Sequence, residues 1–330
     1  MPLAYLDPEY PYWLAKQNLL RQCDLGRLVI LGDSRAAADI RPVLMPVRAT
    51  NLAVGGGEPI EALAALRQVL ACPDPPTRIV LSFDMGHFMK PDLFWERSVR
   101  YGAMDNAALA ELARVSAETG DWSVHEARRT DGLPPSLRAA LYTARFPPFY
   151  VNSLAKGGVF LRWWSNRDRL QAGLDARGQY FFGTASGSDA VALDGQFLRF
   201  APTPVLDWYF DALLALLQSH GIEALFVAMP VNEATGRTIH PEVLAGFRLY
   251  LARYADRYAG FHVLGPVVPV WPGRWFGDGF SHLNPAGADR FSRWLADCLR
   301  VWPARRAGCD APAPDGGQVA SNARLGPSWR

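Results

Sequence analysis

Short apolar runs alternate with segments of helical spacing near the start of the chain, and this rhythm constrains the fold more than any other feature. The run at 27–31 is continuous and apolar, which is typical of a strand buried on both faces, and further strands are expected at 47–52 and 78–83. Helical spacing over 34–40 and 60–70 separates these strands. Because such repeats form right-handed βαβ units, the chain is predicted to be an α/β protein with a central parallel sheet.

The rhythm stops over residues 90–200 and then resumes. This stretch holds a helical segment near 105–118 and proline-rich turns at 133–135 and 146–148, and we interpret it as a large, mostly helical insertion that covers or faces the site. Elsewhere, helices are expected at 8–24, 206–219, 241–258 and 285–301, and strands at 224–229 and 261–264. Residues 1–302 are thus predicted to form one domain, and residues 303–330 a disordered tail.

Charge and hydropathy exclude several classes of protein. The net charge is +2 and the basic residues are scattered, so a nucleic-acid partner is not expected. No apolar run approaches the roughly 18 residues of a membrane helix. Residues 1–8 lack the basic and apolar regions of a signal peptide. The chain as written is therefore expected to be soluble and unexported, an expectation that an upstream start would change.

The cysteines and the nearby acids do not predict a metal site. Cys23, Cys72, Cys298 and Cys309 form no CxxC pair and have no histidine at metal-ligand spacing, so we favour buried or free thiols over a structural disulfide of an oxidising compartment. Asp84 and His87 lie three residues apart, but two ligands are too few for a metal site, so we favour a structural or substrate-contacting role for them. No metal and no cofactor is predicted.

A serine, a histidine and an acid occupy positions that suit nucleophilic catalysis. Ser34 follows the first predicted strand, and His282 and Asp278 lie in a loop before the last predicted helix. Late loops of an α/β sheet lie at the carboxyl ends of the strands, which is also where Ser34 is expected. A serine hydroxyl needs a base, and the base needs an acid to orient it. We therefore assign Ser34 as nucleophile, His282 as base and Asp278 as the orienting acid.

A glycine loop offers donors for an oxyanion. The amides of Gly55–Gly57 are not blocked by side chains, and the Ser34 amide begins a predicted helix. Asn51 either braces this loop or contacts the substrate. Asn232 follows a predicted strand and is either a substrate contact or a solvated loop residue.

Three further positions have two interpretations each. Trp163 and Trp164, with Arg162 and Arg167 nearby, form either a glycan-stacking surface or, as we favour, aromatic core. Arg35 holds an anion beside Ser34 or pairs with a surface acid.

Three blocks of the sequence resemble the SGNH (GDSL) hydrolase superfamily. Gly32–Ser34 matches the first block, Asn51–Gly56 is similar to the second, and Asp278–His282 is similar to the fifth. The resemblance implies a three-layer α/β/α, flavodoxin-like fold, and it places Gly56 with Ser34 in the oxyanion hole.

Within that superfamily, the blocks are similar to a branch associated with acylation of bacterial exopolysaccharides such as cellulose and alginate. This implies a serine esterase or O-acyltransferase acting on carbohydrate esters, in particular acetyl groups of a polysaccharide or a small acyl ester. It also implies a place in the bacterial envelope and a membrane-bound acyltransferase of the same pathway as a partner. The alternatives are a catalytically weak glycan-binding component of an exopolysaccharide assembly machine, or a lipase or thioesterase.

Two positions depart from the superfamily pattern. Asp84 stands where the third block has an asparagine that donates to the oxyanion, and an ionised carboxylate cannot donate. Asp84 therefore points away, or is protonated, or leaves the hole to other donors. The superfamily acid precedes its histidine by three residues, whereas Asp278 precedes His282 by four. A Ser34–His282 dyad is the alternative if Asp278 does not reach the ring.

Overall fold

The computed structural model describes residues 7–91, 93–125, 134–144, 159–302 and 309. Its main sheet is made of β1 (Leu28–Gly32), β2 (Ala49–Asn51), β3 (Arg78–Ser82), β4 (Glu223–Val227) and β6 (Phe261–Leu264). The five strands lie in the order β2-β1-β3-β4-β6, and all neighbours are parallel. This confirms the predicted α/β class with a central parallel sheet, in the strand order of flavodoxin-type sheets.

Strand β1 buries both of its faces. Val29 and Leu31 join the core on one side of the sheet, and Leu28 and Ile30 join the core on the other. Because successive side chains of a strand point to opposite faces, a continuous apolar run is what a central strand requires.

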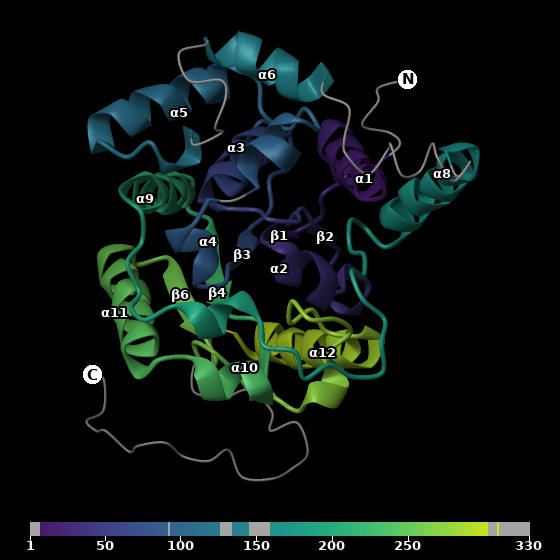
Figure 1. Cartoon of the computed structure of the whole chain (residues 1–330), viewed down its shortest axis with the longest axis vertical. Coiled ribbons are helices and arrows are strands. Elements are labelled where there is room, and N and C mark those ends of the chain that lie inside the picture. The colour runs from purple at the N-terminus through teal and green to yellow at the C-terminus, as the bar shows by residue number, and fades with distance from the viewer. Residues whose placement is uncertain (1–6, 92, 126–133, 145–158, 303–308, 310–330) are drawn as a thin grey trace.

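Helices cover both faces of the sheet, as in a three-layer α/β/α arrangement (Figure 1). One face packs against α3 (Pro59–Leu70), α9 (Pro204–Ser219) and α11 (Pro241–Arg257). The other face packs against α2 (Ser34–Asp39) and α12 (Pro285–Val301). Helix α1 (Tyr10–Arg21) lies near the β2 edge and packs against α8 (Val159–Asp175). No helix of the described residues is long and apolar enough to cross a membrane.

Between β3 and β4 the chain leaves the sheet for the predicted insertion. Helix α4 (Gly86–Met89) precedes it. Its described elements are the π-helical turn η3 (Phe94–Val99), α5 (Asn106–Thr119), η4 (Ser123–His125), α6 (Pro135–Ala144), α8 and η5 (Leu193–Gln196). The segment between α8 and α9 crosses the front of the molecule (Figure 1). Two predicted features, the proline-rich turn at 146–148 and all of the tail at 303–330 except Cys309, lie outside the described residues.

Small elements complete the fold. They are the two-stranded sheet of β5 (Val231–Asn232) and β7 (Val270–Trp271), helix α10 (Glu233–Thr238), and the turns η2 (Pro42–Leu44) and η6 (Gly273–Trp275).

A disulfide joins Cys23, just after α1, to Cys72, just after α3. The favoured prediction of free thiols is therefore wrong for this pair, because the fold brings together two cysteines that are 49 residues apart. Cys298 and Cys309 are buried thiols outside the disulfide, as predicted.

Candidate active site

The end of β1 fixes the position of Ser34. At Gly32 the strand lies so close to β3 that a Cβ atom would be 1.9 Å from the carbonyl oxygen of Ser82, so only glycine allows this register. Asp33 then caps α2, because its Oδ1 accepts hydrogen bonds from the amides of Arg35 (2.9 Å) and Ala36 (3.1 Å). Ser34 is thus held at the first position of the helix, at the carboxyl edge of the sheet.

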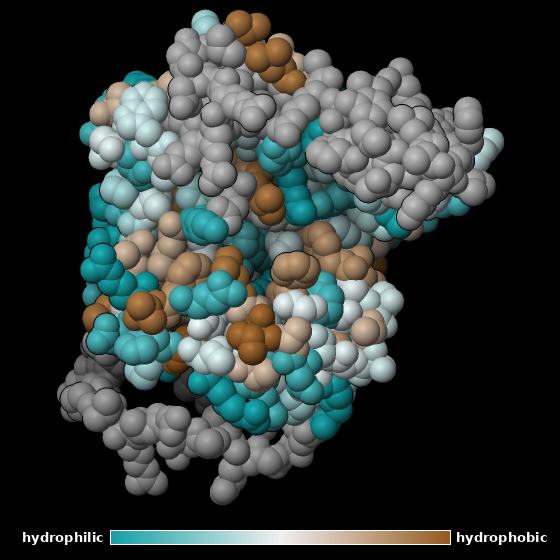
Figure 2. Space-filling view, in the orientation of Figure 1, coloured by the Kyte–Doolittle hydropathy of each residue, from teal (hydrophilic) through white to brown (hydrophobic). Residues whose placement is uncertain are grey.

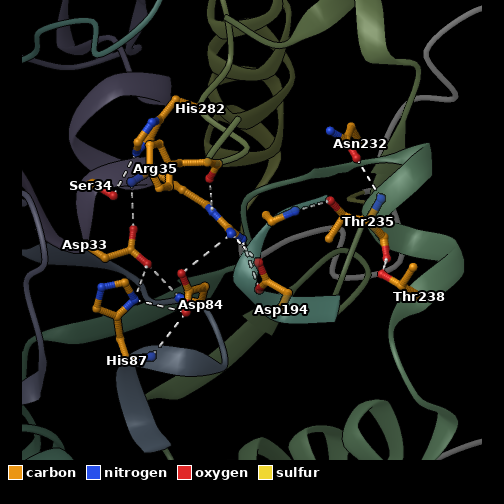
Figure 3. A network of polar contacts seen from close by, with 12 residues as sticks. Asp33, Ser34, Arg35, Asp84, His87, Asp194, Asn232, Thr235, Thr238 and His282 are labelled. Carbon is orange, nitrogen blue, oxygen red and sulfur yellow. Dashed lines mark hydrogen bonds and ion pairs between the residues drawn. The ribbon is translucent and has the colours of Figure 1, made fainter. Parts of the chain in front are cut away.

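His282 and Asp278 reach Ser34 from the loop before α12. Figure 3 shows the His282 ring pointing toward Ser34. The Ser34 Oγ and His282 Nε2 atoms are 2.8 Å apart, and His282 Nδ1 is 2.6 Å from Asp278 Oδ2. With Nδ1–H donating to the carboxylate, Nε2 is free to accept the serine proton. The structure therefore brings the three predicted side chains together as a triad, and not as a dyad.

The extra residue between Asp278 and His282 is taken up by a turn around the carboxylate. Asp278 Oδ1 accepts hydrogen bonds from the amides of Phe280 (2.8 Å) and His282 (3.3 Å), and Ser281 adopts φ = +63°. This tight turn brings the histidine ring back over the acid that precedes it by four residues.

The acid of the triad is held in its ionised form. Burial alone would raise the pKa of Asp278, but the hydrogen bond and charge of His282, together with the two amides, outweigh burial and lower the pKa. An ionised Asp278 can stabilise the imidazolium that forms when His282 takes a proton.

Packing holds the His282 ring from the insertion side. The ring of Phe182 stacks on the imidazole, with centroids 4.4 Å apart and an interplanar angle of 18°. On the other side, the amide of Leu283 donates a 2.9 Å hydrogen bond to Asp39 Oδ1 at the end of α2. The base is therefore positioned by the segment between α8 and α9 and by the helix that carries the nucleophile.

The two predicted oxyanion donors lie at the same cleft. Gly56 lines it in a left-handed conformation (φ = +68°), and a Cβ atom there would be 2.8 Å from Leu93. The Asp33 cap uses the amides after Ser34, and no described turn or loop hydrogen bond uses the Ser34 or Gly56 amide. Both N–H groups are thus available to a ligand oxygen.

Asp84 lies beside these groups in a cluster of charges (Figure 3). Its Oδ1 is 3.0 Å from His87 Nδ1, its Oδ2 is 3.7 Å from Arg35 Nη2, and its amide donates to Asp33 Oδ2 at 2.7 Å. Burial would raise the pKa of Asp84, but the charges of His87 and Arg35 lower it well below its ordinary value. Asp84 is therefore ionised, which supports oxyanion donors elsewhere.

His87 is the matching cation. Burial would lower its pKa, but the carboxylates of Asp84 and Asp33 raise the pKa to about 9. Potential ligand atoms of Asp33, Asp84 and His87 lie within 4.8 Å of one another, so they are the one described group with the spacing of a metal site. A protonated imidazole has no lone pair to give, so the three residues fit an ion-pair cluster better than a metal site.

Arg35 links the nucleophile to the insertion. Its buried guanidinium forms a two-point ion pair with Asp194 of η5, with Nη1 3.2 Å from Oδ1 and Nη2 in contact with Oδ2. Its Nε donates to the carbonyl oxygen of Phe280 at 3.3 Å. The sequence predicted an anion or a surface acid as partner. The partners are the buried acid Asp194, the partly buried acid Asp84 and the loop that carries His282, which we call the histidine loop.

Two predicted polar residues lie outside the cleft and brace its walls. Asn51 Nδ2 donates to the carbonyl oxygens of Ala36 and Ile40, and its Oδ1 accepts from the amide of Ala53. Asn232 caps α10 through the amide of Thr235. It also donates to the carbonyl oxygens of residues 188 and 190, which precede η5. Bracing, the first of the two roles considered for Asn51, matches these contacts.

The two neighbouring tryptophans are not both part of the core. Trp163 and Trp164 belong to α8, and Trp164 is exposed, so the favoured core interpretation is wrong for Trp164. The side chains of Arg162 and Trp163 lie outside the described part of the structure.

The triad opens into a cleft of about 600 Å³. Its walls include apolar side chains that sequence reasoning missed, namely Leu93, Phe182, Val191, Leu193, Phe197 and Phe280. Figure 2 shows this face hollowed near its centre, with apolar side chains beside the hollow. No local pattern distinguishes these residues, because they reach the cleft only through the path of the insertion. No protein-family model, curated protein or solved structure matches the chain.

Proposed function

We propose that this protein is a serine esterase or O-acyltransferase of the SGNH type that acts on carbohydrate esters. The observation that carries the proposal is the hydrogen-bonded series Ser34–His282–Asp278 at the mouth of a cleft. This is the arrangement that activates a serine hydroxyl, and its roles do not depend on chain order.

The geometry supports acyl transfer in two balanced steps. Ser34 Oγ bonds to the ester carbonyl carbon while its proton passes to His282 Nε2, and the carbonyl oxygen becomes an oxyanion facing the Ser34 and Gly56 amides. The carbon–oxygen bond to the leaving alcohol then breaks, and that oxygen takes the proton from Nε2. The oxygen of water or of a sugar hydroxyl next bonds to the acyl carbon while its proton passes to His282 Nε2. The bond from that carbon to Ser34 Oγ then breaks and Oγ takes the proton back from Nε2, so the same groups serve hydrolysis and transfer.

Aromatic side chains on the histidine side favour a sugar as the leaving alcohol. The leaving oxygen must face His282 Nε2, and the ring is flanked by Phe182 and by Phe280, whose centroid is 6.4 Å away. Phe280 is 72% exposed. A flat aromatic face offers a large apolar area on which the C–H face of a sugar ring can pack.

The disulfide supports a place in the cell envelope. Cross-links such as Cys23–Cys72 persist in oxidising compartments and are rare in the cytosol. Such a location would bring the protein to a secreted polysaccharide, with a membrane-bound acyltransferase of the same pathway as the proposed partner.

The direct test is hydrolysis of p-nitrophenyl acetate. The Ser34→Ala variant should lose about 10³-fold or more in kcat/KM, because the activated oxygen is gone. Ser219→Ala, at the exposed end of α9, is the matched control and should keep wild-type rates. If the wild type is no faster than Ser34→Ala, the esterase proposal is wrong.

One observation favours a second candidate, a glycan-binding component with weak catalysis. Asp84 is ionised at a place where the resembled hydrolases have a donor, and a negative charge near an oxyanion slows its formation. Glycan binding that survives both Ser34→Ala and His282→Ala, without turnover by the wild type, would support this candidate.

A further inference from the structure

We propose that the acyl group accepted by this cleft is apolar and longer than acetyl, and that Val191, Leu193 and Phe197 hold it. The proposal rests on the proposed acyl-transfer function and concerns the chemical class of its substrate. It follows from four features of the cleft.

The first feature is that these three side chains sit on a well-anchored segment. We call residues 180–200 the strap. Its backbone is held at residues 188 and 190 by Asn232, and at 192, whose amide donates to Thr235 Oγ1 at 2.9 Å. The Arg35–Asp194 ion pair ties it to the residue after the nucleophile. The apolar wall therefore has a fixed place relative to Ser34.

The second feature is exposed apolar surface inside the cleft. Val191 is 49% exposed and Leu193 is 43% exposed, although both line the same cleft as Ser34. When a ligand covers apolar side chains that are exposed to water on a rigid segment, the burial of apolar surface contributes favourably to the binding free energy. Their position in the catalytic cleft indicates that this ligand is part of the substrate.

The third feature is that the charged lining is already engaged. Arg35 pairs with Asp194 and Asp84, Asp84 pairs with His87, and Asp278 pairs with His282. Arg97 is 3.2 Å from Glu9, and Glu58 and Lys90 also have partners. A substrate segment along the strap therefore meets apolar side chains and charged groups that already have partners, which suits a hydrocarbon chain.

The fourth feature is direction. The leaving alcohol must lie toward His282, so the acyl chain extends toward the other walls. Phe197 lies on that side, since a Cβ atom on Gly86, two residues beyond Asp84, would be 3.5 Å from its ring. The cleft of about 600 Å³ leaves room along this wall for several methylene groups.

The test is a series of p-nitrophenyl esters from acetate through butyrate and hexanoate to octanoate, with the Ser34→Ala rate subtracted. The wild type should show kcat/KM rising from acetate to at least hexanoate, by up to about fourfold per buried methylene. Val191→Ser and Leu193→Ser should each lower the hexanoate-to-acetate ratio by about fivefold, while Leu193→Met should keep it. Leu198→Ser is the matched control, because Leu198 is on the strap and 76% exposed but does not line the cleft.

The possible failures can be told apart. Ser34-dependent turnover that is highest on acetate and falls with length would overturn this proposal and leave the proposed function in place. A rising profile that Leu198→Ser reduces as much as Leu193→Ser would also overturn it, since the strap wall would then not be the binding surface. No Ser34-dependent turnover on any ester would reject the proposed function and this proposal with it.

Discussion

Arg35 connects the residues around Ser34 to two other parts of the chain. It joins the start of α2 to the strap through Asp194 and to the histidine loop through the Phe280 carbonyl. A guanidinium suits this task because its planar fork can make several directed hydrogen bonds at once. The position of the base relative to Ser34 thus depends on an ion pair that lies outside the triad.

Replacing Asp194 with Asn should therefore impair both stability and turnover. The change leaves a buried guanidinium without its main partner, and breaking buried pairs costs about 3–5 kcal/mol of unfolding free energy. We expect a clear loss in urea denaturation and a kcat reduced by about tenfold or more. Asp297→Asn, at an exposed pair with Arg300, is the control and should change neither quantity. Wild-type kcat in Asp194→Asn would show that the pair does not position the loop.

His87 predicts a specific dependence of stability on pH. Its pKa is raised from an ordinary value of about 6.5 to about 9 in the folded protein, so its protonated form stabilises the fold. This contribution is fully present below about pH 6.5 and is lost as the pH rises through 9. It amounts to at most about 3 kcal/mol.

The measurement is the unfolding free energy of wild type and His87→Gln between pH 6 and pH 10. The difference between the two proteins should shrink as the pH rises, because only the wild type loses a stabilising charge. A difference that stays constant over this range would mean that His87 is not held protonated by Asp33 and Asp84.

At the residue scale, the sequence predicted the triad but not its surroundings. Ser34, His282 and Asp278 each lie in a short local pattern beside a predicted strand or helix. Asp194 and Phe182 lie in no such pattern, because their contacts depend on the path of the strap across the molecule. Side chains of this kind are found only once the three-dimensional path is known.

At the scale of elements, the number of residues in a strand or helix determined whether it could be predicted. The sheet strands and long helices show enough residues for a period to appear, and their observed bounds agree closely with the expected ranges. Strands β5 and β7 have two residues each, so they carry no period. The disulfide partners could not be paired from the sequence either, since spacing alone does not determine connectivity.

The disulfide should make a large contribution to stability. Closing a loop of 49 residues restricts the unfolded chain by about 4 kcal/mol in the chain-entropy model. The Cys23→Ser/Cys72→Ser double variant should unfold at lower urea concentration than the oxidised wild type. Reductant should shift the wild type toward the variant and leave the variant unchanged. A wild-type midpoint that does not respond to full reduction would contradict this expectation.

At the scale of the whole molecule, the sheet and the insertion position different parts of the site. The sheet with its two helical layers fixes Ser34, Gly56 and the histidine loop at one edge. The strap then adds one wall of the cleft, anchored on α10 and on Arg35. Under the proposed function, a different strap on the same sheet would keep the chemistry of acyl transfer and change the ester that is accepted.

The stacking of Phe182 on His282 limits which segments could replace the strap. In the proposed mechanism the His282 imidazole gains and loses a proton in every cycle and must return to the same orientation. One of its faces is covered by the Phe182 ring, which comes from outside the sheet. Any transplanted segment must therefore bring its own flat side chain to this point. The insertion therefore helps to position His282. Without it, the α/β domain would keep Ser34 but would lack the ring that holds the His282 imidazole in place.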